Sequence, residues 1–420
     1  MFAWLRRDFK KLGPGLITGA SDDDPSGIAT YSQAGAGFGF STLWSILLTL
    51  PLMIAIQEMC ARIAIVTKRG LVANMRRRHS RPFVFWVVLS LLVANVINIG
   101  ADLGMMASAV QLLVPGPFFG ILLIVGLLTL ALQIFIPYTQ YAKYLKWLTL
   151  SLLAYVGVAF ALEIDWLNAL WSTVLPQGSW SKKYLLILVA LLGTTISPYL
   201  YFWQANQEVE ESHEEVGVYG KNNHSLWRKL KAMRFDVSVG MIFSNVVAWF
   251  IIVSAAAVLD GRTYVEITTA DQMAQILEPL AGRLTSILFA LGIIGTGLLT
   301  TPILSSTAAY ALSELFGFKE GLSRTFLQAK FFYGLIIAAT VVGALMNMVG
   351  ISPVRGLIYA AILNGLIAPP LIYMIVRLGG DERLMGKQRN SRLSSFFGWM
   401  TFGVMTGAIV GWVIVTFVDF

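Results

Sequence analysis

The chain has 420 residues, of which 56% are hydrophobic and 13% are charged, about half the charged fraction of a typical soluble domain. Its net charge is +8, and its single cysteine, Cys60, excludes an internal disulfide and a cysteine-cluster metal site. The apolar residues form long runs, and a run of about twenty residues can cross a bilayer as a helix. These runs are too long for the alternating strands of a membrane β-barrel, which have about ten residues.

We therefore expect an all-α integral membrane protein that forms one domain over residues 1–420. Eleven membrane helices are predicted, at 13–38, 42–66, 82–112, 116–136, 145–163, 183–208, 233–259, 284–313, 329–348, 355–377 and 396–418. The remaining stretches are too short for a second, water-soluble domain. The sequence shows neither a nucleophile–base pair nor a cofactor motif, so we expect neither an enzyme nor a resident cofactor.

Lysine and arginine residues indicate the orientation, because they concentrate in cytoplasmic segments. With a cytoplasmic N-terminus, nearly all of them fall inside, and those outside are Lys182, Lys183, Arg262, Arg283 and Arg355. We expect a cytoplasmic N-terminus and, because eleven is odd, an outside C-terminus. The basic residues would face anionic lipid, so the charge implies no nucleic-acid partner. Compact loops without targeting segments favour a bacterial inner membrane.

The sharpest local feature is the segment 21–27, Ser-Asp-Asp-Asp-Pro-Ser-Gly, in the middle of the first predicted helix. Three carboxylates, on Asp22, Asp23 and Asp24, are costly at that depth. Pro25 removes a backbone donor, and Gly27 permits unusual dihedral angles. The helix should unwind here, which is tolerated only where the chain lines a cavity. The alternative is a helix that starts after Pro25, with the aspartates in an exposed loop.

A second interruption, at 193–199 (Gly-Thr-Thr-Ile-Ser-Pro-Tyr), lies in the sixth predicted helix. Helices one and six are the first members of two successive five-helix sets. Paired broken helices at equivalent positions are typical of transporters built from inverted repeats, with the binding site at the midplane. We therefore predict a 5+5 inverted repeat, with repeats at 13–163 and 183–377 and an accessory helix at 396–418.

The polar groups at the two breaks predict a hard site with oxygen ligands only. A carboxylate, hydroxyl groups and backbone carbonyls suit Mg²⁺, Ca²⁺ and Mn²⁺. The histidines, His79, His213 and His224, fall in predicted cytoplasmic loops and are expected to be solvated. This placement argues against a histidine-rich zinc or copper site.

Other polar residues each leave two interpretations open. Asp102, in the third predicted helix, either belongs to a polar pathway or is a hydrogen-bonded structural residue. Glu58 and Arg62, four residues apart, are expected to form a structural pair. The glutamates that end the sixth helix form either an acidic exit vestibule or a solvated helix end; they are Glu208, Glu210 and Glu211.

The residues around the breaks resemble those of the NRAMP divalent-metal transporters. The segments 13–15 (Gly-Pro-Gly), 24–27 (Asp-Pro-Ser-Gly) and 33–36 (Gln-Ala-Gly-Ala) are similar to that family's first helix, whose hallmark is Asp-Pro-Gly-Asn. The segment 57–62 resembles its second helix, and 193–205 aligns without gaps with its sixth-helix motif, Met-Pro-His-Asn-x-Tyr-x-His-Ser. The resemblance covers nearly the whole chain and implies a LeuT-type fold and alternating access.

The resemblance also implies a set of site residues, some of which depart from the family pattern. The family's metal-binding Asp falls on Asp24, but its Asn falls on Gly27 and its Met on Ser197. A carbonyl donor falls on Thr194. Loss of the Met thioether removes a soft ligand, so these departures resemble the branch of NRAMP-related magnesium transporters.

The family's proton route is also altered. Its two sixth-helix histidines correspond to Tyr199 and Gln204. Its third-helix Asp-x-x-Glu corresponds to Asp102 and Met105, so one acid is missing. Because tyrosine has a pKa near 10 and glutamine does not titrate, neither replaces a histidine near neutral pH.

The sequence thus predicts a transporter that takes up Mg²⁺, and also Mn²⁺, by alternating access without proton coupling. The predicted ligands are Asp24, Ser21, Gly27, Thr194 and Ser197, and the candidate pathway residues are Asp22, Asp23, Asp102, Tyr199 and Gln204. The metal ion and the lipid bilayer are the expected partners, with no obligate protein partner evident. The alternatives are a proton-coupled Mn²⁺/Fe²⁺ symporter, an amino-acid carrier on the same scaffold and a non-transporting receptor.

Overall fold

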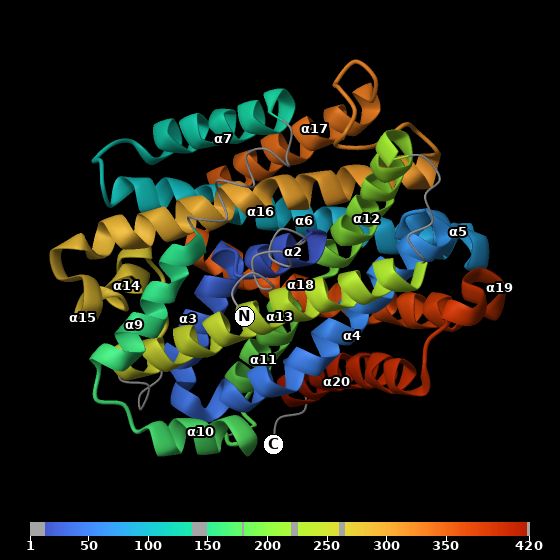
Figure 1. The fold of residues 1–420 in the computed structure, drawn as a ribbon. Helices are drawn as coiled ribbons and strands as arrows, with labels where there is room; N and C mark the ends of the chain where they lie inside the picture. Colours follow the sequence, from blue (N-terminus) through green and yellow to red (C-terminus); the bar gives the residue numbers. More distant parts are fainter. Residues whose placement is uncertain (1–12, 137–148, 179, 220–225, 260–264, 418–420) are drawn as a thin grey trace.

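The computed structural model describes residues 13–136, 149–178, 180–219, 226–259 and 265–417 (Figure 1). Every regular element in these ranges is helical. The α-helices are α2 (Pro14–Asp22), α3 (Pro25–Phe38), α4 (Leu43–Thr67), α5 (Leu71–Arg78), α6 (Arg81–Gln111), α7 (Phe118–Phe135), α9 (Leu153–Ala161), α10 (Trp166–Val174), α11 (Lys182–Thr195), α12 (Pro198–Tyr219), α13 (Leu226–Val258), α14 (Ala270–Gln275), α15 (Glu278–Ala281), α16 (Thr285–Phe316), α17 (Lys330–Met346), α18 (Pro353–Gly380), α19 (Glu382–Met385) and α20 (Arg392–Phe417).

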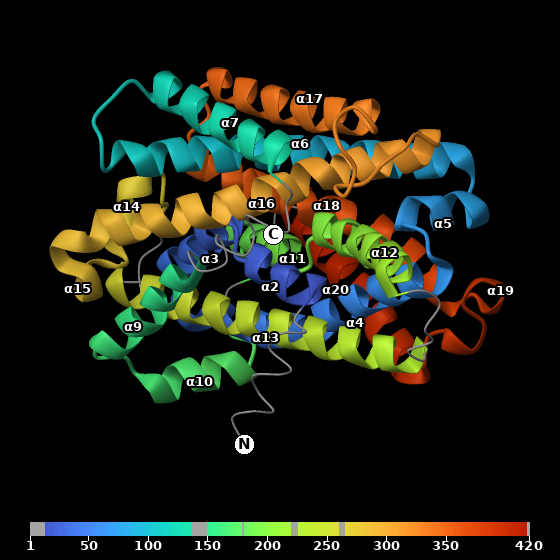
Figure 2. The same cartoon turned by 45° about the horizontal axis from the view of Figure 1, so that its top comes forward.

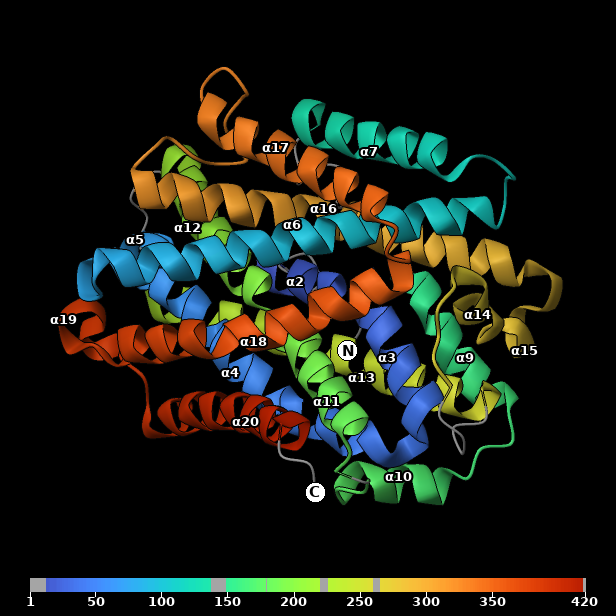
Figure 3. The same cartoon turned by 180° about the vertical axis from the view of Figure 1, so that it is seen from behind.

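Both predicted helix breaks are present. The first helix divides into α2 and α3, and the sixth divides into α11 and α12. Pro25 and Pro198 each open the second half, because proline fits the first turn of a helix, where its missing N–H would have no partner. In the views of Figures 1 and 3, α2 lies in the middle of the bundle, and α12 runs from there toward one end of it.

Long helices surround the broken ones. α13 packs along α2 and α3, and α18 packs along α11 and α6. The helices approach at glycines: a Cβ at Gly19 would collide with the backbone of Gly240, and one at Gly193 would collide with the backbone of α18. Small residues allow this close contact between membrane helices. Figure 2 shows α7 and α17 at one edge of the bundle and α10 at the opposite edge.

The predicted eleven helices can be compared with the apolar spans of the described residues. Nine spans there are long and apolar enough to cross a membrane. One of them, Pro25–Thr67, contains the second half of the first predicted helix and all of the second. The fifth predicted helix, at 145–163, appears as the shorter apolar helix Leu150–Ala161, and its first residues lie outside the described ranges. All eleven predicted segments thus contain helix.

Some connecting segments differ from the prediction. The connection between the sixth and seventh predicted helices, which holds His213 and His224, was expected to be a cytoplasmic loop. Its described residues are largely helical, because α12 continues to Tyr219 and α13 begins at Leu226. His213 therefore lies in a helix, and His224 lies outside the described residues. His79 follows α5 but is half-buried, with its Nε2 atom fully buried, so the expectation that it is solvated was wrong. The apolar pattern did not predict the short helices α5 and α10.

Candidate functional site

Asp24 joins the first break to two other helices. It is the N-cap of α3, and its Oδ1 accepts hydrogen bonds from the Gly27 N–H and the Ser26 hydroxyl, both at 2.7 Å. Its Oδ2 accepts from Asn98 on α6 at 3.4 Å and from the Tyr199 hydroxyl on α12 at 3.3 Å. Asp24 is 1% exposed. The hydrogen bonds of the N-cap hold Oδ1 at the start of α3, and Oδ2 faces the space between α3, α6 and α12.

Backbone at the end of α2 borders the same space. The carbonyl of Ser21 accepts from the Tyr199 hydroxyl at 3.2 Å and from the Thr300 hydroxyl on α16 at 3.4 Å. The Ser21 hydroxyl donates to Ile17 within α2. Ser21 therefore presents its carbonyl, the stronger acceptor for a cation, toward the residues that contact Asp24.

The second break lies against the first. A Cβ at Gly27 would lie 3.4 Å from the Thr194 hydroxyl and 3.0 Å from the Asp22 carbonyl. Ser197 stays at its own helix end, where its hydroxyl donates to the carbonyls of Thr194 at 2.5 Å and Gly193 at 3.2 Å. The structure therefore brings Ser21, Asp24, Gly27 and Thr194 together, whereas no hydrogen bond among the described residues joins Ser197 to Asp24.

Asp22 and Asp23 face a different helix. The Ser244 hydroxyl on α13 lies 2.7 Å from Asp22 Oδ2 and 3.2 Å from Asp23 Oδ1. Both aspartates are fully buried, which rules out the alternative of an exposed loop at 21–27. The three aspartates do not converge, and no cluster of three acidic, histidine or cysteine residues able to hold a metal occurs in the described part of the chain.

Asp102 lies on α6 one helical turn beyond Asn98, so the two side chains share a face. It is fully buried, and neither carboxylate oxygen has a hydrogen-bond partner among the described residues. Among the described residues, no hydrogen bond supports the interpretation of Asp102 as a hydrogen-bonded structural residue. Met105 is also fully buried, so an apolar side chain stands where the resemblance implies a second acid.

Gln204 lies on the α2 side of α12. Its Oε1 accepts from Gln57 on α4 at 2.6 Å and from Thr18 on α2 at 3.4 Å. Gln204 thus ties three helices together away from Asp24, whereas Tyr199, on the same helix, contacts Asp24 directly.

Sequence reasoning missed several polar residues of the site, namely Asn98, Ser244 and Thr300. Asn98 carried a detectable signal, because Asn95, Asn98 and Asp102 form a polar stripe at helical spacing in an otherwise apolar helix. Thr300 lies directly before Thr301 and Pro302, a polar interruption within α16. Ser244 has no such signal, since single serines are common in membrane helices.

Carboxylates on the predicted cytoplasmic side bind backbone N–H groups of other segments. Asp236 on α13 accepts from Gly15 at 2.7 Å and from Leu16 at 3.2 Å, at the N-terminus of α2. Glu210 on α12 accepts from Leu322 at 2.8 Å and from Ser323 at 2.9 Å. Glu208, on the same helix, is buried. The idea that the glutamates ending the sixth helix are solvated is therefore wrong for Glu208 and Glu210.

Glu58 and Arg62 form the expected pair on α4, at 3.0 Å. Arg62 is buried and also donates to the Gln388 carbonyl and to Asn390 Oδ1, in the connection between α18 and α20. Glu58 also pairs with Arg234 of α13 at 2.9 Å. These contacts agree with the structural role predicted for the pair.

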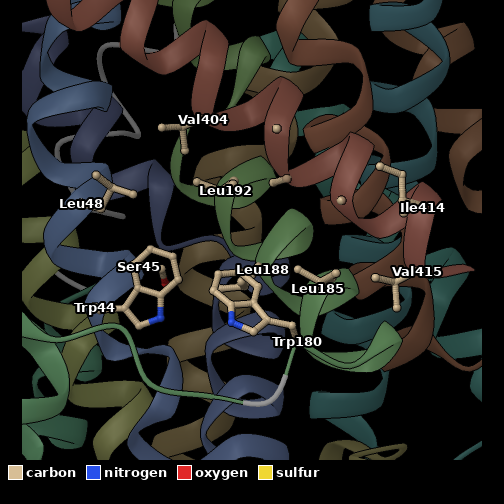
Figure 4. Close-up of a pocket in the computed structure, with 13 residues that line it drawn as sticks. Trp44, Ser45, Leu48, Trp180, Leu185, Leu188, Leu192, Val404, Ile414 and Val415 are labelled. Carbon is tan, nitrogen blue, oxygen red and sulfur yellow. The ribbon is translucent and has the colours of Figure 1, made fainter. Parts of the chain in front are cut away.

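The site at the break is distinct from an apolar cavity elsewhere in the described part of the molecule. A cavity of about 350 Å³ lies between α4, α11 and α20 and is lined by residues such as Trp44, Trp180 and Leu188 (Figure 4). Its lining offers almost no ligand oxygen, so it is unsuited to a hydrated cation.

Comparison with known proteins identifies relatives along the whole chain. The model of the family described as natural resistance-associated macrophage protein-like (Nramp) matches residues 15–415. A protein of Pseudomonas aeruginosa named divalent metal cation transporter MntH 1 is 26% identical over 418 residues, covering 96% of this chain and 91% of that protein.

Solved structures share the fold. The manganese transporter of Eremococcus coleocola superposes with a TM-score of 0.74 at 18% identity, covering 100% of this chain and 90% of that one. Mhp1, a nucleobase-cation-symport-1 family transporter, superposes with a TM-score of 0.53 at 14% identity, covering 98% and 94% of the two chains. The predicted LeuT-type fold is thereby confirmed.

Proposed function

The chain belongs to the Nramp family, and on that premise we propose that it carries divalent metal cations across a membrane by alternating access. The observation that carries the proposal is the oxygen set at the first break. Asp24 supplies a buried carboxylate whose Oδ2 accepts two long hydrogen bonds from the described residues, and Ser21 supplies a carbonyl beside it. Hard divalent cations bind such oxygens.

Mg²⁺ is the proposed preferred substrate, and Mn²⁺ is also carried. Gly27 and Ser197 stand where the family resemblance implies an amide and a thioether ligand, so the nearby donors are oxygens. Mg²⁺ sheds its water reluctantly and is usually bound through few protein ligands. The hydroxyls of Tyr199 and Thr300 border the same space and can bind the water that the ion keeps.

The proposed transport is a uniport down the electrochemical gradient. With a cytoplasmic N-terminus, an inside-negative potential drives uptake by about 2.3 kcal/mol per charge per 100 mV, doubled for a divalent ion. The repeats at 13–163 and 183–377 would rock about the two breaks, with 396–418 as an accessory helix. The bilayer we propose is the bacterial inner membrane, with the C-terminus outside.

A proton-coupled Mn²⁺/Fe²⁺ symporter is the second candidate, and Asp102 is the residue that favours it. A buried carboxylate without a hydrogen-bond partner can hold a proton near Asp24. Tyr199 and Gln204 occupy the positions of the two sixth-helix histidines of the family motif. Beyond Asp102, the proton route therefore lacks a group that titrates near neutral pH.

The test is ion flux into proteoliposomes that contain a pH-sensitive dye, with Mg²⁺, Mn²⁺ and Zn²⁺ supplied outside in turn. We expect Mg²⁺ and Mn²⁺ influx with no more internal acidification than in protein-free vesicles. Acidification that scales with metal flux and disappears in Asp102→Asn would establish the symporter instead. Zn²⁺ entry exceeding that of Mg²⁺ would refute the proposed selectivity.

A further inference from the structure

A polar cavity of about 530 Å³ lies away from the two breaks, near the start of α6, the end of α18 and the start of α20. Its polar and aromatic lining residues are Arg78, His79, Arg377, Asp381, Ser395 and Trp399. They come from the end of α5, the end of α18 and the start of α20. These are the ends that the Lys and Arg distribution assigns to the cytoplasmic face, so the cavity lies at a boundary between lipid and water.

Positive charge in this cavity is only partly neutralised. Arg78 is held by Asp381 in a two-point contact, at 2.6 Å from Nε to Oδ2 and 2.9 Å from Nη2 to Oδ1. Asp381 also caps α19, so its oxygens are fully used. Arg377 is exposed and forms no hydrogen bond or ion pair with another described residue. One guanidinium group is therefore free to bind an anion.

His79 supplies a second polar group without a hydrogen-bond partner. Its Nε2 atom is buried and has no hydrogen-bond partner among the described residues. Burial lowers the pKa of His79, and nearby Arg377 lowers it further, so the two side chains lie within electrostatic reach of each other. A neutral imidazole can donate one hydrogen bond to an oxyanion.

Two exposed aromatic side chains lie at or beside the cavity. The ring of Tyr373 lies 6.4 Å from His79 and 5.9 Å from Trp399. Trp399 is 41% exposed and Tyr373 is 37% exposed. Exposed Trp and Tyr side chains concentrate at the level of the lipid headgroups. The rim of the cavity therefore suits a molecule with a charged head and an apolar tail.

We propose that this cavity binds the phosphate group of an anionic phospholipid from the cytoplasmic leaflet. The Arg377 guanidinium contacts the phosphate oxygens in a forked geometry, His79 and Ser395 border the headgroup, and Trp399 packs against the start of the acyl chains. Basic cavities between membrane helices on the cytoplasmic side are suited to such headgroups. The proposal does not depend on which ion is transported.

The experiment titrates the purified full-length protein in detergent with short-chain phosphatidylglycerol, short-chain phosphatidylcholine, glycerol phosphate or inorganic phosphate. The readouts are the rise in Tm, since a ligand that binds the folded state stabilises it, and tryptophan fluorescence. Phosphatidylglycerol should raise Tm more than phosphatidylcholine. Arg377→Gln should weaken phosphatidylglycerol binding about tenfold, the effect of one lost hydrogen bond between charged groups.

The matched control is Arg77→Gln, which removes the same charge from an exposed position on α5 outside the cavity lining. It should leave phosphatidylglycerol affinity unchanged. Arg377→Lys keeps the charge without the fork and should bind with intermediate affinity, which provides a test if the Gln variant does not fold. Equal losses in Arg77→Gln and Arg377→Gln would overturn the site. If inorganic phosphate or glycerol phosphate raised the Tm as much as the lipid does, the lipid assignment would be overturned.

Discussion

Buried carboxylates occur in two regions of this molecule, and their oxygens have different partners. At the breaks and on α6, Asp22, Asp23 and Asp102 each keep at least one oxygen without a hydrogen bond among the described residues. On the predicted cytoplasmic side, Asp236 and Glu210 use both oxygens on backbone N–H groups of other segments. The aspartates at the first break and on α6 therefore leave hydrogen-bond acceptors unused, whereas the cytoplasmic acids join helices to other segments of the chain.

This difference separates acids with unused acceptors from acids that join segments. Asp24, the proposed ligand, differs from both groups, because its oxygens accept hydrogen bonds from side chains and from the N–H of its own helix. A buried polar atom without a partner is costly, and such atoms in a native protein require an explanation, such as an absent ion or proton. A carboxylate that accepts two backbone N–H groups has that cost already offset. Substitutions at the breaks should therefore change ion transport, whereas those on the cytoplasmic side should change conformation or stability.

The largest expected effect is that of Asp24→Asn. Asparagine is a good N-cap, so α3 should still start at Pro25, but the charge that faces the space between α3, α6 and α12 is lost. Even residues behind a metal ligand cost about 10–100-fold in affinity when changed. We expect divalent uptake into proteoliposomes to fall by more than about a hundredfold, and Asp24→Ala to do the same.

Asp22→Asn is the matched comparison for Asp24, because it removes the same charge two residues away but on the α13 side. A charge that does not touch the ion contributes on the order of 1–2 kcal/mol at an effective dielectric constant near 20, which is about tenfold or less. Equal losses in the Asp22 and Asp24 variants would show that these two aspartates act as one site.

The next prediction concerns the choice between soft and hard metal ions. Ser197→Met adds a thioether near the second break, and combination with Gly27→Asn adds an amide, so Cd²⁺ should gain affinity and Mg²⁺ uptake should fall. The Ser197 variant is tested alone first, because a Cβ at Gly27 would already lie 3.0 Å from the Asp22 carbonyl. Competition of Cd²⁺ and Mg²⁺ against Mn²⁺ uptake measures the change. An unaltered order of competition would mean that Ser197 does not face the ion.

A smaller effect is expected from Asp236→Ala. The change leaves the Gly15 and Leu16 N–H groups without their acceptor, which costs about 1–3 kcal/mol, so α2 should leave α13 more often. Cysteine introduced at buried Thr18, with Cys60 replaced by alanine, should react several-fold faster with a maleimide applied to the cytoplasmic face. Asp271→Ala, an exposed acid on α14, is the control and should leave the labelling rate unchanged.

The sequence predicted the backbone of the site better than its side-chain partners. Pro25 and Pro198 interrupt apolar runs, and that local signal located both breaks. Asp24 could be singled out because a carboxylate at membrane depth is rare. By contrast, the pairing of Asp22 with Ser244 depends on how α13 packs against α2, which involves residues more than two hundred positions apart.

Long-range contacts also explain the wrong predictions. His79 looked like a loop residue because basic residues surround it, yet the ring of Tyr373 from α18 helps to bury it. Glu210 looked like the solvated end of a helix because polar residues follow it. Its acceptors are instead filled by backbone N–H groups of the segment after α16, and unpaired backbone groups leave no pattern in a sequence.

Glu320 lies on the predicted cytoplasmic side but has a buried oxygen, Oε2, without a partner among the described residues, and Glu314 has one as well, Oε1. These two acids therefore depart from the pattern of Asp236 and Glu210. Burial, together with the charges of Glu314 and Glu210, raises the pKa of Glu320 to about 9. Between the ordinary value of 4.5 and about 9, the folded protein therefore keeps a proton that the unfolded chain releases. Its stability must fall as the pH rises through that interval.

We expect the Tm of the wild-type protein to fall by a few degrees more than that of Glu320→Gln between pH 6 and pH 9, because glutamine holds no titratable proton. Tryptophan fluorescence during heating in detergent gives both values. Glu382→Gln, at an exposed position on α19, is the control and should follow the wild type. If Glu320→Gln keeps the full pH dependence, another group releases the proton, and Glu320 is not the source of the fall in stability.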